Sequence, residues 1–186
     1  MTPFEYLSVL LSIILGLAIT QVLQGYRALL LVRHSVKTYW PSLIWSGLIL
    51  LFVAQAWWAS FGLEQQTEWR FDTFLVILLQ MALIYMLAAL VLPDLTADAE
   101  TDLAAHYERQ RRPFFICLAL VVVVSLVKDL MLEGRLPEPM NIAFHVALAA
   151  VALLGLMLRR PSAQLALALF VATIFGLYVG LLFARL

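Results

Sequence analysis

Six long apolar stretches constrain the fold of this chain more than any other feature. They cover residues 4–26, 41–61, 71–92, 113–132, 140–158 and 162–183. A helix needs about 20 mainly apolar residues to cross the hydrocarbon core of a bilayer, and each stretch reaches or nearly reaches that length. The stretches lack the alternating pattern of barrel strands, and backbone groups in lipid must bond within their own segment. The sequence therefore predicts an all-α polytopic membrane protein, a bundle of six transmembrane helices in a single transmembrane domain (1–186).

The composition excludes other broad classes of protein. Of the 186 residues, 64% are hydrophobic and 13% are charged, whereas an average soluble domain is roughly 45–50% apolar and 25% charged. The formal net charge is zero, so the chain has no excess of basic residues with which to bind nucleic acid. One cysteine, Cys117, excludes an intrachain disulfide and a thiolate metal cluster.

Prolines and tryptophans support these boundaries. Pro41, Pro113 and Pro161 lie at or just before predicted helix starts, where a missing N–H costs little. Trp40, Trp57 and Trp58 bracket the second stretch, as aromatic residues at a membrane interface do. Beyond residue 26 the apolar pattern of the first stretch continues as far as Val32, which predicts a tilted or overlong helix.

The segment between the third and fourth stretches is the only sizeable polar connection. Its acidic residues come early and its basic residues come late, which complements a helix dipole. Leu95, Ala99, Leu103 and Tyr107 recur every four residues and would form one weakly apolar stripe. This pattern predicts a short amphipathic helix over about 95–111 on the inner membrane surface, with a solvated connector as the alternative.

The distribution of lysine and arginine predicts the orientation. Eight of the twelve lie in the first, third and fifth connections, on one side of the predicted bundle. Cytoplasmic loops carry such an excess. We therefore expect a multi-pass protein of the bacterial inner membrane with both termini outside the cytoplasm.

Two stripes of small residues recur at every fourth position, which places each stripe on one helix face. The first helix carries Ser8, Ser12, Gly16 and Thr20, and the sixth carries Ala168, Ala172, Gly176 and Gly180. Small side chains let two helix backbones approach closely. The stripes predict tight packing within the bundle. The alternatives are a seam between copies of the chain and, for the first helix, a polar lining for a pathway.

Polar residues inside or near the ends of the spans form a candidate polar site. The members are Glu5, Lys128, Asp129, Asn141 and His145 near one end of the bundle, with Gln55 and Gln80 deeper. Ionisable residues within membrane spans are costly and often mark functional pathways. A carboxylate, an ammonium and an imidazole at one depth can bind an ion, relay protons or sense pH. The alternatives are charged side chains that reach the interface and a structural hydrogen bond between the two amides.

Motifs of catalysis and cofactor binding do not occur in the sequence. There is no glycine-rich phosphate loop, nucleophile elbow or HExxH motif, and no helix carries two metal-ligand residues four apart that would support a zinc or paired-haem site. The sequence therefore predicts no enzymatic reaction, cofactor or metal. Trp45, Tyr85 and Tyr178 are expected to face lipid or to pack in the bundle.

Three segments carry a resemblance. The run from Glu5 to Leu17 (EYLSVLLSIILGL), the triplet Tyr39-Trp40-Pro41 and the triplet Leu92-Pro93-Asp94 resemble those of a family of small uncharacterised polytopic bacterial inner-membrane proteins. The resemblance covers most of the chain and implies a multi-pass fold without a known activity.

The polar residues favour a channel-like or transporter-like protein that moves an ion or a proton-linked small solute. The alternative is a non-transporting accessory subunit or sensor that binds a membrane partner. In either case the expected partners are the lipid bilayer and either further copies of the chain or another membrane protein.

Overall fold

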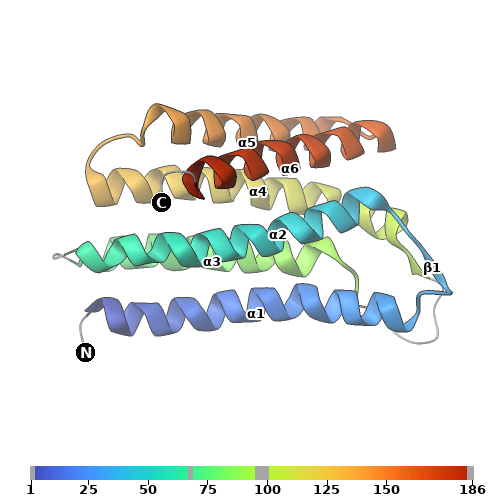
Figure 1. Ribbon diagram of the computed structural model, residues 1–186, viewed down its shortest axis with the longest axis horizontal. Helices are drawn as coiled ribbons and strands as arrows, with labels where there is room; N and C mark the ends of the chain where they lie inside the picture. Colours follow the sequence, from blue (N-terminus) through green and yellow to red (C-terminus); the bar gives the residue numbers. More distant parts are fainter. Residues whose placement is uncertain (1–2, 67–68, 95–100, 184–186) are drawn as a thin grey trace.

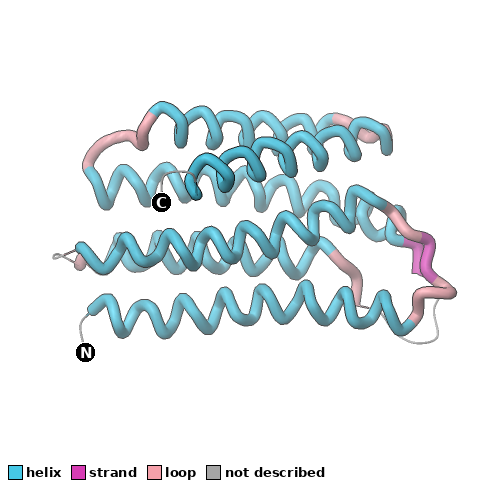
Figure 2. Tube along the Cα trace, viewed as in Figure 1, coloured by secondary structure: helices cyan, strands magenta, loops and turns pink. Residues whose placement is uncertain are grey.

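The computed structural model describes residues 3–66, 69–94 and 101–183, which form a bundle of antiparallel helices (Figures 1 and 2). Its six long helices are α1 (Pro3–Leu31), α2 (Trp40–Ala59), α3 (Phe71–Val91), α4 (Leu103–Glu133), α5 (Pro139–Met157) and α6 (Pro161–Phe183). A short 3-10 helix, η1 (Ser60–Gln65), extends α2. All six long helices are long and apolar enough to cross a membrane. The predicted all-α membrane fold is therefore confirmed.

The bundle has two ends, which differ in structure. At the N-terminal end lie the start of α1, the α2–α3 connection and the α4–α5 connection, on the left of Figure 1. At the other end, called the far end below, lie the α1–α2, α3–α4 and α5–α6 connections. Two strands of two residues each, β1 (Val36–Lys37) and β2 (Thr101–Asp102), pair in parallel there. This two-stranded pair holds the α1–α2 connection beside the start of α4.

Helix α4 corrects one prediction. The sequence predicted a separate surface helix over 95–111 and a fourth span that starts at residue 113, but α4 runs without a break from Leu103 to Glu133 with Pro113 inside it. Residues 95–100 lie outside the described part of the chain. Asp102 starts the helix by accepting hydrogen bonds from the backbone N–H groups of Ala104 and Ala105, at 2.8 and 3.1 Å. Neighbouring helices stabilise proline inside a membrane helix, so Pro113 was a poor marker of a helix start.

Helix α1 packs along α2 and α3 at one edge of the bundle. Its buried face consists of Leu7, Leu11, Leu15, Ala18 and Val22, which recur at helical spacing. The opposite face is also apolar, with exposed residues such as Val9 and Leu17. Apolar residues on the outer face suit a helix that contacts lipid, because lipid tails are as apolar as the core.

The small-residue stripes lie only partly inside the bundle. On α1, Ser12, Gly16 and Thr20 are exposed and Ser8 is half-buried, so this stripe points away from the other helices. On α6, Ala168 is buried, Ala172 is half-buried, and Gly176 and Gly180 are exposed. Packing within the bundle was therefore the wrong interpretation for α1 and for the second half of the α6 stripe. The apolar residues between the small ones make the closer contacts instead.

Candidate functional site

A cavity of about 250 Å³ lies between α2, α3, α4, α5 and α6 in the N-terminal half of the bundle. Six of the seven residues of the candidate polar site line it: Gln55, Gln80, Lys128, Asp129, Asn141 and His145. They come from four different helices, so the fold gathers side chains that are far apart in the sequence. The cavity runs from the ends of these helices to Leu118, in the middle of α4, and to Leu87, about one turn before the end of α3.

Glu5 is the predicted member that the cavity does not include. It lies in the first turn of α1 and is exposed. Only Leu11 of α1 reaches the cavity wall. Glu5 precedes Leu7 by two residues, about 200° around a helix, so it cannot share the buried face that begins at Leu7.

His145 on α5 is fixed by two hydrogen bonds. Its Nδ1 lies 2.7 Å from the backbone oxygen of Asn141, and its Nε2 lies 3.1 Å from Oγ of Ser125 on α4. A carbonyl oxygen only accepts hydrogen bonds, so Nδ1 carries the proton and donates it. The Ser125 hydroxyl can either donate to Nε2 or accept from it. Ser125 was missed in the sequence because a single serine in an apolar run has no distinctive spacing.

Lys128 and Asp129 form an ion pair at the cavity mouth. Nζ of Lys128 lies 3.2 Å from Oδ1 of Asp129, and the two side chains are only 21% and 22% exposed. Both residues line the cavity, so their position is not simply that of charges reaching the membrane surface. The pair places one positive and one negative charge at the mouth.

Gln80 lies deeper, on α3. Its side chain is 8% exposed, and its Oε1 accepts no hydrogen bond from the described residues. Gln55 on α2 lines the same cavity. The direct amide pair suggested by the sequence is therefore not made through the Gln80 oxygen. A buried acceptor without a partner is costly, and because Gln80 lines the cavity, a turn of its amide about the last side-chain torsion brings this oxygen to the cavity.

An aromatic wall covers one side of the cavity. It consists of Phe52 from α2, Phe144 from α5, and Phe175 and Tyr178 from α6. The Phe52 and Phe175 rings meet edge to face at 4.9 Å between centroids, and Phe144 stacks on Tyr178 at 5.2 Å. The sequence placed Tyr178 among lipid-facing or packing aromatics. An aromatic residue in an apolar span does not reveal which face of its helix points inward.

A second aromatic cluster lies on α2 and α4, beyond the residues that line the cavity. Trp45 and Phe115 are fully buried, and Phe114 is 3% exposed. The Trp45 ring lies 5.2 Å from that of Phe114 and 5.6 Å from that of Phe115, both edge to face. Gly155 on α5 allows its helix to approach the Phe115 ring closely. Beyond the cavity, this part of the bundle is therefore closely packed.

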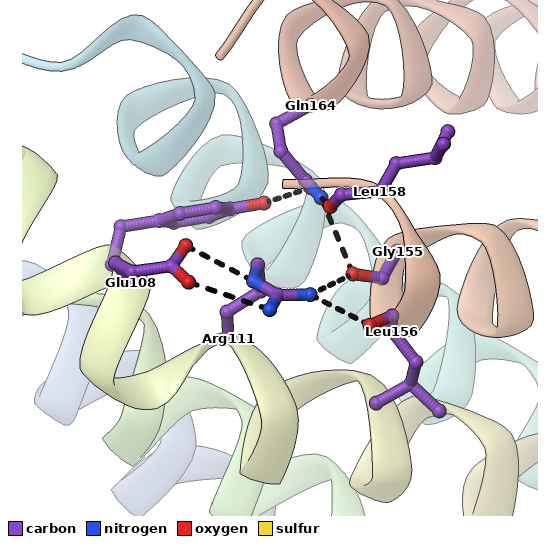
Figure 3. A network of polar contacts seen from close by, with 7 residues as sticks. Glu108, Arg111, Gly155, Leu156, Leu158 and Gln164 are labelled. Atoms are coloured by element: carbon purple, nitrogen blue, oxygen red, sulfur yellow. Dashed lines mark hydrogen bonds and ion pairs between the residues drawn. The ribbon is translucent and has the colours of Figure 1, made fainter. Parts of the chain in front are cut away.

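A polar network closes the far end of the bundle (Figure 3). Arg111 is 2% exposed, and its Nη1 donates to the backbone oxygens of Gly155 and Leu156 at 2.7 and 2.9 Å. Its Nε donates to Glu108 at 3.0 Å. Gln164 donates to the oxygens of Gly155 and Leu158 and accepts from Tyr107. These donors satisfy carbonyls at the C-terminal end of α5, where a positive charge is also favourable.

The last turn of α3 is capped in the same way. His106 on α4 lies 3.1 Å from the backbone oxygen of Leu90, and Ser42 on α2 donates to that of Val91 at 3.1 Å. The start of α4 and residues of α2 and α6 thus satisfy the ends of two neighbouring helices. The sequence analysis used Arg111 only as a charge that sets orientation, because a capping role depends on a helix end 44 residues away.

Within the described residues, no group of three or more histidine, cysteine or acidic side chains is placed to hold a metal ion. The chain was also compared with protein-family models, with curated proteins and with solved structures, and no family, protein or structure matched.

Proposed function

We propose that this integral membrane protein is transporter-like and binds a small solute in the cavity of its N-terminal half. The supporting observation is that six predicted polar residues line a single cavity, beyond which Trp45, Phe114 and Phe115 are buried in a packed cluster. A channel needs a continuous path through the bundle, whereas a cavity that stops short of this packed cluster suits one state of a transporter. Transporters bind their solutes near the bilayer midplane, which this cavity approaches.

His145 suits a proton-linked mechanism. When the ring is neutral, the Ser125 hydroxyl donates to Nε2, and when the ring is protonated, Nε2–H donates to the hydroxyl. In both states Nδ1 donates to the Asn141 carbonyl. The ring can therefore gain or lose a proton without losing either hydrogen bond, as a side chain that carries protons must.

Alternating access predicts a particular labelling pattern. In a Cys117→Ala background, we expect Ala56→Cys, in the cavity wall, to react with a membrane-impermeant maleimide added outside intact cells. Ala152→Cys lies one turn beyond the cavity on α5 and is fully buried. We expect the thiol of Ala152→Cys to react slowly and only in inverted vesicles, because the far end opens only in a less populated conformation.

Ala54→Cys is the matched control on α2. Ala54 is exposed on the outer face of the helix, so its thiol faces lipid and should not react from either side. If Ala152→Cys stays unreactive from both sides while Ala56→Cys reacts, the transport proposal fails and a sensor remains. Labelling of Ala56→Cys from the cytoplasmic side alone would instead overturn the proposed location of the termini outside the cytoplasm of a bacterial inner membrane.

A second candidate function is a subunit or sensor that works through contact with a second copy of the chain. The exposed small-residue stripe of α1 favours it, because a Cβ added to Gly16 would meet nothing within 4 Å. The hydroxyl of Thr20 donates to the Gly16 oxygen at 2.8 Å and that of Ser8 to the Glu5 oxygen at 2.9 Å. These polar groups are thus satisfied, and the face is smooth enough for close helix approach.

Cross-linking tests this seam. In the Cys117→Ala background, Gly16→Cys should form a disulfide-linked dimer in membranes under mild oxidation. Ala18→Cys is the control, because Ala18 lies on the buried face of the same helix and should not cross-link. Equal amounts of dimer in the two variants would show that the α1 stripe is not a seam between copies.

A further inference from the structure

The amide of Gln80 makes the deep part of the cavity chemically selective. Its Oε1 accepts no hydrogen bond from the described residues, although the side chain is only 8% exposed and lines the cavity. Buried polar atoms are nearly always paired in folded proteins. The amide can turn about its last side-chain torsion, which is broad, and so present this oxygen to the cavity. An occupant that then donates an O–H or N–H group to the oxygen removes the cost of the unpaired acceptor, whereas an occupant without a donor leaves that cost in place.

The walls around Gln80 determine the rest of the occupant. Aliphatic residues such as Ile84, Leu118 and Leu148 form one side, and the aromatic wall forms the other. Aromatic side chains favour a ring placed edge to face or offset against them. An engineered apolar cavity of about 150 Å³ holds benzene. On the same scale, this cavity of about 250 Å³ holds an occupant of about ten non-hydrogen atoms.

The mouth indicates that the occupant is uncharged. Lys128 and Asp129 line the cavity as a pair at 3.2 Å, so their charges offset each other. Both ring nitrogens of His145 are engaged by Asn141 and Ser125. Below the mouth the described lining carries no charged side chain. A charged occupant would lose its hydration on entering the cavity and would find no opposite charge there, which is unfavourable in apolar surroundings.

We propose that the cavity binds an uncharged, ring-bearing amphipathic molecule whose hydroxyl or N–H group donates to Oε1 of Gln80. This inference rests on the proposed function only in taking the cavity as a binding site. It does not require movement of the solute across the membrane, so binding and transport are tested separately.

Matched probes test the donor. β-Naphthol is close to the expected size and carries one hydroxyl, whereas its methyl ether keeps the ring and oxygen but lacks the donor. We expect the protein in lipid nanodiscs to bind β-naphthol about tenfold more tightly than the methyl ether. Isothermal titration calorimetry, corrected with protein-free nanodiscs, measures both affinities.

Variants assign the preference to one side chain. Gln80→Leu should bind both probes with similar affinity, and its binding of the methyl ether also shows that the variant is folded. Gln24→Leu is the matched control, because Gln24 is an exposed amide of α1 away from the cavity, and it should keep the tenfold preference. Ala56→Phe, which fills the cavity from α2, should abolish binding of both probes.

The charge preference is tested in the same way. Wild-type protein should bind β-naphthol more tightly than the anion β-naphthoate or the cation naphthylmethylammonium. Asp129→Asn leaves Lys128 unpaired and should therefore improve binding of β-naphthoate severalfold. The proposal is overturned if Gln80→Leu keeps the preference for β-naphthol, if a charged probe binds best to the wild type, or if no probe binds. Loss of alternating access with the probe preference intact would overturn transport alone.

Discussion

Replacing Arg111 with methionine should lower the free energy of unfolding by about 3 kcal/mol. The guanidinium donates to two carbonyl oxygens of α5 and to Glu108, and hydrogen bonds from charged donors contribute about 1.5–3 kcal/mol each. Replacing both partners of a buried ion pair by apolar residues can be neutral. Here the acceptors are backbone oxygens that no substitution removes, so the backbone oxygen of Leu156 would lose the hydrogen bond that Arg111 donates to it. Unfolding in mixed micelles, followed by circular dichroism as sodium dodecyl sulfate is added, measures the change.

Arg112→Met is the control for this experiment. Arg112 neighbours Arg111 but is exposed, so its loss removes the same charge and a side chain of the same size without uncapping a helix. We expect the free energy of unfolding of Arg112→Met to differ from that of the wild type by less than about 0.5 kcal/mol. Arg111→Lys should fall between the two, because one ammonium cannot reproduce the fork of a guanidinium. Unfolding of Arg111→Met and Arg112→Met at the same detergent fraction would contradict the capping role.

Gly155→Ala should destabilise the bundle by about 1–3 kcal/mol even though alanine is the better helix former. The added Cβ would lie 2.5 Å from Cε1 and Cζ of the Phe115 ring. That ring is fully buried and lies against Phe114 and Trp45, at 5.3 and 5.6 Å between centroids. The ring has little room to move, so the free-energy cost of overpacking exceeds the gain of up to about 1 kcal/mol in helix propensity. The same detergent titration measures the effect.

Gly176→Ala provides the comparison, because a Cβ there would meet nothing within 4 Å. It should leave stability unchanged or raise it by up to about 1 kcal/mol. A second variant, Gly155→Ala combined with Phe115→Leu, should recover part of the loss by removing the ring edge. If Gly155→Ala is as stable as Gly176→Ala, the close approach of α5 to Phe115 does not limit packing.

The helix boundaries could be predicted because length and apolarity are properties of the chain alone. The spans from 71 and from 140 begin within one residue of α3 and α5. The start of α4 was missed because it depends on the cap formed by Asp102, on the burial of Leu103 and on the hydrogen bonds from Arg111 to α5. Proline is a strong signal of a helix start in water, but a weak one in a membrane bundle.

The rotation of each helix about its axis was much harder to predict. In a soluble helix the polar face points to water, whereas here the lipid-facing and core-facing sides are both apolar. The α1 stripe around Gly16 was therefore assigned to the wrong side. The sequence grouped Lys128, Asp129 and His145 correctly, because ionisable side chains are rare in membrane spans and almost always face the bundle interior or a cavity. Ser125 and Phe175 carried no such signal, and only the packing of α4 to α6 places them at the cavity.

The one-sided cavity has an electrical consequence. It extends along α4 from Asp129 to Leu118, which is about 16 Å at the rise of a helix and about half of a hydrocarbon core of roughly 30 Å. In a transporter of the proposed kind, with water filling the mouth, the membrane potential falls mostly across the packed half of the bundle, and the local field is about twice that of an intact bilayer. Each elementary charge that crosses this half gains about 2.3 kcal/mol per 100 mV. On the proposed function, the packed aromatic cluster and the Arg111 network thus form the layer at which the membrane potential acts.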